Sequence, residues 1–267
     1  MQKTELIKQI RKKKSYLCVG LDTDITKLPV AFREMEDSIY EYNKIVIQQT
    51  SDFAVAYKLN LAFYESIGYK GWISLEKTLK LIPDNIFKIA DAKRGDIGNT
   101  SKQYAITFFK TYNFDAITVS PYIGEDSISP FMEFDGKWVI ILALTSNKGS
   151  NDFQLLEFEG KKLYEHILEK SLKWGSDQNI MYVVGATHPD HFTHIRTMIP
   201  YHFILIPGVG AHGGDLEAIS HYAMNKDIGI LVNVSRNILF PDNNFSFPEN
   251  IRQEAINYQK QMAVFVK

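Results

Sequence analysis

The sequence predicts a single (β/α)8 barrel. Eight apolar runs alternate with stretches of helical pattern along the 267 residues, and this alternation is typical of a parallel sheet covered by helices. The runs are apolar throughout rather than at every second residue, as expected for strands buried on both faces. Polar residues gather directly after these runs, which in a barrel is the end that carries active sites.

The predicted strands are short apolar runs bounded by polar or glycine-containing segments. They cover residues 16–21, 53–57, 86–90, 116–119, 138–144, 180–184, 203–206 and 228–232. The predicted helices cover residues 39–50, 61–81, 100–111, 126–134, 161–174 and 249–264, the second of them broken near Gly68 and Gly71. Asp215 is well placed to cap the helix after the seventh strand. No low-complexity linker divides the chain, so residues 1–267 are expected to form one domain.

Composition narrows the class of protein. A net charge of -1 and a pI near 6.7 give no basic stripe for nucleic acid. We find no signal peptide and no apolar run long enough to span a bilayer, so no membrane partner is expected. Cys18 is the single cysteine, which leaves no disulfide within the chain and fits a reducing compartment. We therefore expect a cytoplasmic protein.

The most unusual use of charge follows the third predicted strand, in Asp91-Ala92-Lys93-Arg94-Gly95-Asp96. Because side chains alternate along a strand, Asp91 and Lys93 are predicted to point the same way. An ion-paired strand end facing solvent is the simpler interpretation, since charge clusters are only probabilistic evidence of a site. Polar residues after the other strands weigh against it, because all belong to the same predicted face of the barrel. They are Asp22, Lys58, Asn60, Ser120, Ser146 and Arg236.

The glycine-rich segment after the seventh strand predicts a phosphate site. Gly208 and Gly210 allow close backbone approach, the amides of the next helix point at an anion, and Arg236 adds a charged fork. The segment also matches G-x-G-x-x-G through Gly213, so a dinucleotide site is an alternative. The acid that this motif needs, Asp227, lies before the eighth strand rather than after it, and we interpret the match as accidental.

Three histidines, His188, His191 and His194, suggest a metal cluster. They lack a pair of histidines at a four-residue step and a nearby acidic ligand. Surface histidines on a short helix are the simpler interpretation, and we predict no metal site.

At this point the residues match a known family. The pattern D-x-K-x-x-D-I-x-x-T, at Asp91, Lys93, Asp96, Ile97 and Thr100, resembles the signature of the orotidine 5′-monophosphate decarboxylase family. Further matches are Leu21-Asp22, Tyr57-Lys58-Leu59-Asn60, Leu144-Thr145-Ser146, Pro207-Gly208-Val209-Gly210 and Ser235-Arg236. The resemblance is to the longer bacterial type and extends over nearly the whole chain.

Two alternatives stay open. D-x-K-x-x-D alone also occurs in related metal-dependent barrel enzymes that act on sugar phosphates, such as 3-keto-L-gulonate 6-phosphate decarboxylase and hexulose phosphate synthase. The second alternative is a non-catalytic barrel that binds nucleotides, in which the charged residues would be unnecessary.

The resemblance implies conversion of orotidine 5′-monophosphate (OMP) to uridine 5′-monophosphate (UMP) and CO2 in pyrimidine biosynthesis, without a metal or cofactor. Lys93 would protonate C6 of the pyrimidine within an alternating array of Lys58, Asp91, Lys93 and Asp96. The resemblance also implies a homodimer, in which Asp96 and Thr100 enter the partner's active site. Residues implied to bind the substrate are Asp22, Asn60, Thr100, Ser146, Gly208, Gly210, His212 and Arg236.

One residue departs from the family pattern. His212 stands where glutamine is common, and a histidine can both donate a hydrogen bond and, when protonated, add charge. We predict that phosphate affinity weakens as the pH rises through the titration of His212. Measuring KM from mildly acidic to alkaline pH tests this, and a His212→Gln variant with the wild-type pH profile would contradict it.

Overall fold

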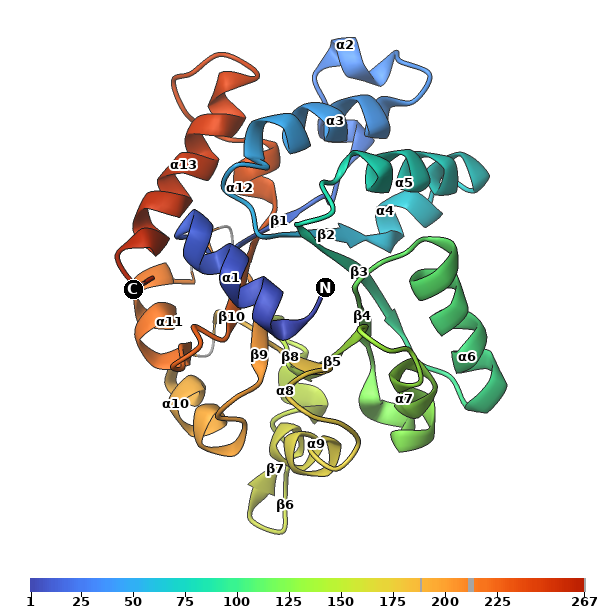
Figure 1. Cartoon of the computed structure of the whole chain (residues 1–267), viewed down its shortest axis with the longest axis vertical. Coiled ribbons are helices and arrows are strands. Elements are labelled where there is room, and N and C mark those ends of the chain that lie inside the picture. Colours follow the sequence, from blue (N-terminus) through green and yellow to red (C-terminus); the bar gives the residue numbers. More distant parts are fainter. Residues whose placement is uncertain (188, 211–213, 267) are drawn as a thin grey trace.

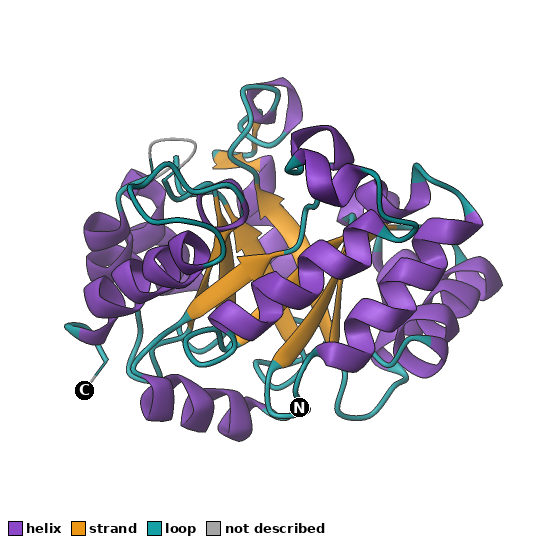
Figure 2. Cartoon of the chain, turned by 90° about the horizontal axis from the view of Figure 1, so that it is seen from above, coloured by secondary structure: helices purple, strands orange, loops and turns teal. Residues whose placement is uncertain are grey.

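The structure is a computed structural model that describes residues 1–187, 189–210 and 214–266. Eight parallel strands close into a barrel in the order β1-β10-β9-β8-β5-β4-β3-β2, and helices surround it (Figures 1 and 2). The predicted barrel is confirmed. Its strands are β1 (Leu17–Gly20), β2 (Ala56–Asn60), β3 (Phe87–Arg94), β4 (Ala116–Val119), β5 (Trp138–Leu144), β8 (Ile180–Val184), β9 (Phe203–Pro207) and β10 (Ile230–Val234).

The helices lie mostly on the outside of the barrel, whereas α1 crosses the end at which the strands begin (Figure 1). They are α1 (Lys3–Lys13), α2 (Val30–Arg33), α3 (Ser38–Thr50), α4 (Leu61–Glu65), α5 (Tyr69–Leu81), α6 (Gly98–Ile106), α7 (Glu125–Met132), α8 (Ser150–Phe153), α9 (Leu163–Ser171), α10 (Pro189–Met198), α11 (Leu216–Ala223), α12 (Arg236–Leu239) and α13 (Glu249–Ala263). Short turns of 3-10 helix occupy Ile25–Lys27 and Pro121–Ile123, and a π-helical turn occupies Thr107–Thr111. None of the described helices is long and apolar enough to cross a membrane.

Two strands are shifted along the sequence from their predicted positions. β2 was expected at 53–57, but the amides of Phe53 and Ala54 donate to the carbonyl of Thr50 and close the turn after α3. β10 was expected at 228–232, but Ile228 and Gly229 both have positive φ angles, 69° and 63°, and form the turn before it. In both cases an apolar residue serves a turn, which hydrophobicity alone does not reveal.

The fifth βα unit is more elaborate than predicted. The helix expected at 161–174 begins at Leu163, because the preceding residues form an antiparallel hairpin of β6 (Glu157–Phe158) and β7 (Lys161–Lys162). Elsewhere two local predictions are confirmed. Gly68, with φ 65°, separates α4 from α5, whereas Gly71 lies inside α5. The side chain of Asp215 accepts a hydrogen bond from the amide of Glu217 to cap α11.

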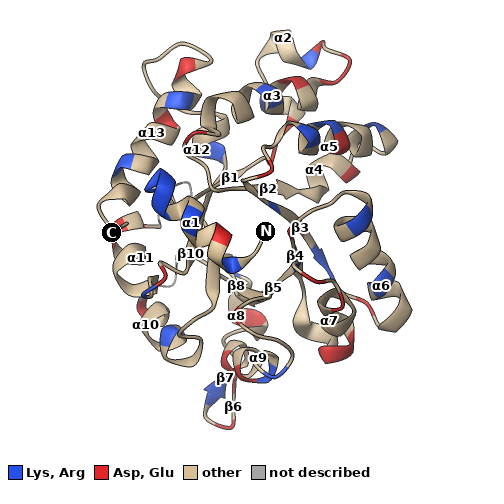
Figure 3. Cartoon of the chain, in the orientation of Figure 1, with Lys and Arg blue, Asp and Glu red and all other residues tan. Residues whose placement is uncertain are grey.

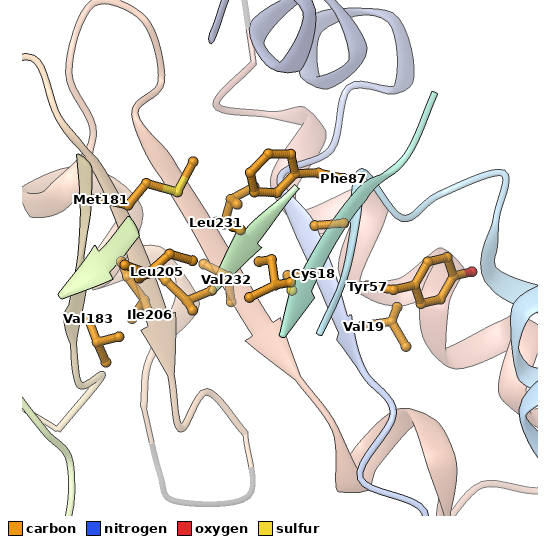
Figure 4. Close-up of a cluster of buried hydrophobic side chains, with 14 of the residues drawn as sticks. Cys18, Val19, Tyr57, Phe87, Met181, Val183, Leu205, Ile206, Leu231 and Val232 are labelled. Atoms are coloured by element: carbon orange, nitrogen blue, oxygen red, sulfur yellow. The ribbon is translucent and has the colours of Figure 1, made fainter. Parts of the chain in front are cut away.

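The hydrophobic core fills the barrel and the layer between strands and helices. Figure 4 shows Cys18 and Leu231 within this buried cluster, with Tyr57 set apart from them. The Tyr57 hydroxyl lies 2.7 Å from the Thr50 hydroxyl of α3, so this ring points outward. Alternation along β2 then turns Lys58, the next residue, toward the barrel interior.

Charge is distributed very unevenly over the described barrel strands. Charged residues occur there only in β2 and β3, as Lys58, Lys88, Asp91, Lys93 and Arg94. In Figure 3 the blue segments on the barrel strands accordingly lie on β2 and β3. A parallel barrel buries its strands on both faces, so charges in this wall need partners, and their partners define the candidate site.

Candidate active site

The centre of the site is the carboxylate of Asp91, which is shared by two lysines. Lys58 on β2 places its Nζ 2.6 Å from Asp91 Oδ2, and Lys93 on β3 places its Nζ 2.6 Å from Asp91 Oδ1. The prediction that Asp91 and Lys93 face one another is confirmed. β3 does not end at residue 90 as expected, because the charged residues stay in the strand through Arg94.

The three side chains differ sharply in burial. The Lys58 and Asp91 side chains are 5% and 10% exposed, whereas that of Lys93 is 51% exposed. Burial alone would raise the pKa of Asp91, but the ammonium groups of Lys58 and Lys93 outweigh it and hold that pKa well below its usual range. Burial likewise opposes the charge on Lys58, but Asp22 and Asp91 raise its pKa above the ordinary value. Asp91 and Lys58 are therefore both charged at neutral pH.

Asp22, which follows β1, continues this line of charges. Its Oδ1 lies 3.6 Å from Lys58 Nζ, and its Oδ2 accepts a hydrogen bond of 2.8 Å from the Ser235 hydroxyl. Oδ1 is buried and accepts no hydrogen bond from any described group. A buried oxygen without a donor is costly, and it gives a ligand hydroxyl a place to bind.

Behind Asp22 a buried polar network fixes the loop after β1. Thr23 donates to Asn43 Oδ1 at 2.5 Å, and Asn43 donates in turn to the Tyr64 hydroxyl at 3.0 Å. Tyr64 closes the network by donating to the Leu21 carbonyl at 3.3 Å. All four of these residues are buried, so the residues on either side of Asp22 are held from α3 and α4.

Asp96 does not join these charges within the described part of the chain. Its Oδ1 accepts a hydrogen bond of 2.8 Å from the amide of Ile97, and it forms no ion pair with any described residue. The line of charges in a single chain is therefore Asp22, Lys58, Asp91 and Lys93. Asp22 lies at the Lys58 end of this line, whereas Asp96 was predicted at the Lys93 end and in the partner's site. Asp96 lies beyond the end of β3, in the segment that leads to α6, and Thr100 of α6 is exposed. Arg94 turns outward as well and pairs with Glu65.

The predicted phosphate-binding residues meet at two neighbouring strands. Gly208 and Gly210 follow β9 with φ angles of 97° and 77°, and Arg236 opens α12 directly after β10. β9 and β10 pair in register, with Asn233 opposite Pro207, so these residues share one edge of the barrel. A Cβ on Gly210 would lie 2.5 Å from Asn237 Nδ2, so that side chain would have to move, and the positive φ disfavours a larger residue there as well. His212 and Gly213 lie outside the described residues.

A sequence model described as the orotidine 5′-phosphate decarboxylase / HUMPS family matches residues 15–244. The chain belongs to this family. A relative named orotidine 5′-phosphate decarboxylase from Phocaeicola vulgatus is 54% identical over 266 residues, which cover 98% of each chain. Another of that name from Bacteroides fragilis is 52% identical over 271 residues, covering 100% of this chain and 99% of the other.

Solved structures agree with this assignment. The OMP decarboxylase of Leishmania donovani is 36% identical with a TM-score of 0.86, and the match covers 100% of this chain and 99% of that one. A UMP synthase from the same organism is 38% identical with a TM-score of 0.87, and the match covers 98% of this chain and 56% of that one. The family resemblance predicted from Asp91, Lys93 and Asp96 is confirmed. The decarboxylase name carried by relatives near 50% identity gives no support to a metal-dependent sugar-phosphate enzyme.

Two further residues predicted to bind substrate lie at the same barrel face in this family member. Asn60 ends β2, and its Oδ1 accepts a hydrogen bond of 3.3 Å from the Ala62 amide, capping α4. Ser146 follows β5, and its carbonyl accepts a hydrogen bond of 3.2 Å from the Thr187 hydroxyl. Both side chains are partly exposed.

The histidines considered as metal ligands have other partners. His191 Nδ1 lies 2.9 Å from the Tyr164 hydroxyl, and His194 Nε2 lies 2.5 Å from Glu165 Oε1. His188 lies outside the described residues. Among the described residues, no group of three or more His, Cys, Asp or Glu side chains is arranged to hold a metal ion.

Sequence reasoning missed two residues that touch the charges. Ser235 donates to Asp22, and Thr118 of β4 donates to Asp91 Oδ1 at 3.1 Å. Ser235 carried a signal, since it directly precedes Arg236 after the eighth strand. Thr118 carried a weaker one, as the single hydroxyl in the apolar run of β4.

Proposed function

We propose that the chain, acting as a single domain, is a decarboxylase that converts OMP to UMP and CO2 without a metal or cofactor. The observation that carries the proposal is the Asp91 carboxylate held 2.6 Å from both Lys58 Nζ and Lys93 Nζ. Membership of the decarboxylase family and the decarboxylase names of the relatives support it. The Lys93 ammonium is half-exposed at the rim of the barrel, where a substrate can reach it.

The reaction sets a clear physical problem. Breaking the bond between C6 and the carboxylate releases CO2 and leaves the electron pair on C6, where resonance stabilises it poorly. Lys93 delivers a proton to C6 and later regains one from solvent, so that OMP and one proton give UMP and CO2. Asp91 holds the Lys93 ammonium in place through their ion pair, and its own negative charge disfavours the substrate carboxylate relative to the transition state.

Binding energy from the rest of the nucleotide offsets this unfavourable contact. The buried Oδ1 of Asp22 is free of described donors and would accept a ribose hydroxyl beside Lys58. The Gly208–Gly210 backbone and Arg236 would hold the phosphate, His212 would add to that grip, and Ser146 and Asn60 would bind near the pyrimidine and the array. Apart from His212, which lies outside the described residues, each of these roles is assigned to a residue at the end of the barrel where the strands finish.

The test is a spectrophotometric assay of OMP decarboxylation with a chelator present. Wild-type protein should remain fully active, and Lys93→Ala should lose at least about 10³-fold in kcat because the proton donor is gone. Lys88→Ala is the matched control, since Lys88 lies on the same strand but pairs with Asp84. Activity that persists in Lys93→Ala would contradict the mechanism, and activity lost with the chelator would favour a metal-dependent enzyme.

The proposal includes a cytoplasmic homodimer in which Asp96 and Thr100 complete the partner's site. It is supported by the geometry of Asp96, which has no ion-pair partner among the described residues of its own chain. Mixing equal amounts of Lys93→Ala and Asp96→Ala proteins and allowing subunits to exchange should restore about a quarter of wild-type activity. Half of the dimers are then mixed, and each mixed dimer has one intact site. A mixture no more active than the separate variants would contradict shared sites.

A further inference from the structure

The backbone that presents Lys93 is irregular. β3 and β4 pair at Ala90 opposite Ile117 and again at Arg94 opposite Val119. Between these pairs, three residues of β3 face the single residue Thr118 of β4, so β3 bulges. A bulge re-aims side chains and interrupts the hydrogen bonds of the ladder, and this one lies at the two residues that hold the charges, Asp91 and Lys93.

The bulge places Lys93 in an unfavourable backbone conformation. Its φ angle is 48°, in the left-handed region that disfavours residues with a Cβ. Such a conformation persists only when the surrounding structure determines it. The bulge interrupts the regular ladder between β3 and β4 at Lys93, and the backbone amide of Lys93 donates to a side chain.

The Thr118 hydroxyl forms the hydrogen bond to the Lys93 amide at the point where the bulge interrupts the ladder. Its Oγ1 accepts a hydrogen bond of 3.0 Å from the Lys93 amide and donates one of 3.1 Å to Asp91 Oδ1. Asp91 Oδ1 is also the oxygen that lies 2.6 Å from Lys93 Nζ. One hydroxyl therefore ties the main chain of Lys93 to the carboxylate that its own ammonium contacts, in a closed ring of hydrogen bonds.

Thr118 is itself held rigidly. It is 1% exposed, lies in the middle of β4, and its neighbours Ile117 and Val119 are fully buried core residues. A β-branched side chain in a strand has a restricted χ1 angle, so the hydroxyl direction is fixed by the barrel wall. Both of its described hydrogen bonds go to the charged array, one to Asp91 and one to Lys93. A hydroxyl with only a structural role in the core could bond to a nearby backbone carbonyl instead.

We propose that Thr118 is a positioning residue for the decarboxylation, whose hydroxyl sets the bulge at Lys93 and thereby the place of the proton donor relative to Asp91. The inference rests on the proposed function for its chemistry and on the geometry of β3 and β4 for its structure. The hydroxyl acts on the placement of Lys93 and touches neither the ribose-binding nor the phosphate-binding residues. Its loss should therefore lower kcat and leave substrate binding almost unchanged.

The experiment compares three variants. Thr118→Val keeps the shape and removes the hydroxyl, Thr118→Ser keeps the hydroxyl and removes the methyl group, and Thr50→Val removes a buried hydroxyl far from the charges, in α3. For Thr118→Val we expect kcat for OMP to fall about 10- to 100-fold, the size of effect that follows from removing a buried hydrogen-bonding group. KM and the calorimetric Kd for UMP should stay within about twofold. Thr118→Ser should retain most of kcat, and Thr50→Val should lower the melting temperature without changing kcat.

Crystal structures of wild type and Thr118→Val provide a readout that does not depend on activity. We expect the variant to lose the left-handed φ at residue 93 and the contact between Lys93 Nζ and Asp91 Oδ1. Should Thr118→Val fail to fold, Thr118→Ala repeats both measurements without placing a methyl group against the charges. Wild-type protein inactive on OMP would overturn the proposed function, while these structures would still decide the positioning role.

Three results would overturn the inference. The first is Thr118→Val with kcat within twofold of wild type. The second is Thr118→Ser as impaired as Thr118→Val, which would assign the effect to packing. The third is an unchanged Lys93 backbone and an unchanged contact with Asp91 in the crystal structure of Thr118→Val.

Discussion

At the end of the barrel where the strands begin, Arg196 of α10 is surrounded by carbonyl oxygens. Its guanidinium donates hydrogen bonds to the backbone carbonyls of Ile199, His202, Ala223 and Gly229. At the opposite end, Lys93 has its ammonium 2.6 Å from Asp91 and its side chain 51% exposed. The first cation donates four hydrogen bonds to buried backbone carbonyls, whereas the second is half-exposed and can be reached by a substrate.

Other charged groups repeat this difference. Lys3 of α1 is buried at the beginning of the strands, and its Nζ reaches Asp177 Oδ2 at 2.5 Å and the Tyr201 carbonyl at 2.9 Å. At the other end Asp22 Oδ1 is buried and accepts no hydrogen bond from the described residues. Buried charges stabilise a fold only when their partners are complete. The comparison therefore separates a structural end of the barrel from a functional one.

The largest expected effect comes from removing charge at the functional end. Asp91→Asn should lower kcat by at least about 10³-fold, because a preorganised charge is lost beside the reacting carbon. Stability should change less, since Lys58 keeps Asp22 as a partner and Lys93 is open to water. The OMP assay and urea unfolding measure the two effects, with Asp84→Asn as the control at a fully exposed carboxylate near the beginning of the same strand. A kcat of Asp91→Asn within tenfold of the wild-type value would contradict the distinction between a structural and a functional end of the barrel.

At the structural end we expect the opposite result, a loss of stability without a loss of kcat. Arg196→Met should lower the free energy of unfolding by about 3 kcal/mol, because several buried carbonyls lose their donor. The kcat of the folded fraction should stay unchanged, as Arg196 touches none of the charged array. Urea unfolding and the OMP assay test this, and Arg252→Met serves as a control for an arginine paired at the surface with Asp52. A variant that loses kcat and keeps its stability would contradict the comparison.

A smaller effect depends on pH. His202 is buried at the structural end, and neither ring nitrogen has a hydrogen-bond partner among the described groups. Burial lowers the pKa of His202 to about 4, with Asp177 opposing the shift and Lys3 and Arg196 adding to it. The unfolded chain takes up a proton at this residue as the pH falls below its ordinary value near 6.5, whereas the folded chain stays neutral. The stability contributed by neutral His202 is thus present above pH 6.5 and is lost as the pH falls toward 4.

This loss should amount to about 2 to 3 kcal/mol between pH 7 and pH 4.5. Urea unfolding of wild type and His202→Leu at both pH values isolates it, because the variant should lack this part of the pH dependence. His221→Leu, at an exposed histidine, should keep the wild-type dependence. Equal pH dependence in wild type and His202→Leu would show that His202 is not held neutral.

The barrel and three of the four residues of the charged array, Lys58, Asp91 and Lys93, could be predicted from the sequence. β4, β5 and β8 were predicted at their observed bounds, because a parallel strand buried on both faces is an apolar run of its own length. Alternation along one strand predicted Asp91 and Lys93 on the same side, although the observed contact is made within a bulge of β3. The role of Thr118 could not be predicted this way, since it arises from the register between β3 and β4, which lie on different segments of the chain. The absence of Asp96 from the single-chain array is likewise set by the backbone after Gly95.

The distribution of functional residues around the barrel has a consequence for substrate size. The charged array lies on β2 and β3, and the glycine and arginine residues follow β9 and β10, with β1 between the two groups. Neighbouring strands are about 4.8 Å apart, so a ligand must bridge roughly 10 Å from β10 to β2 to touch both. The separation of the two groups of residues therefore sets the length of a ligand that can contact both. Under the proposed roles of these residues, orotate alone or a ribose phosphate alone would contact one of the two groups, and the intact nucleotide is the shortest of the three that would contact both.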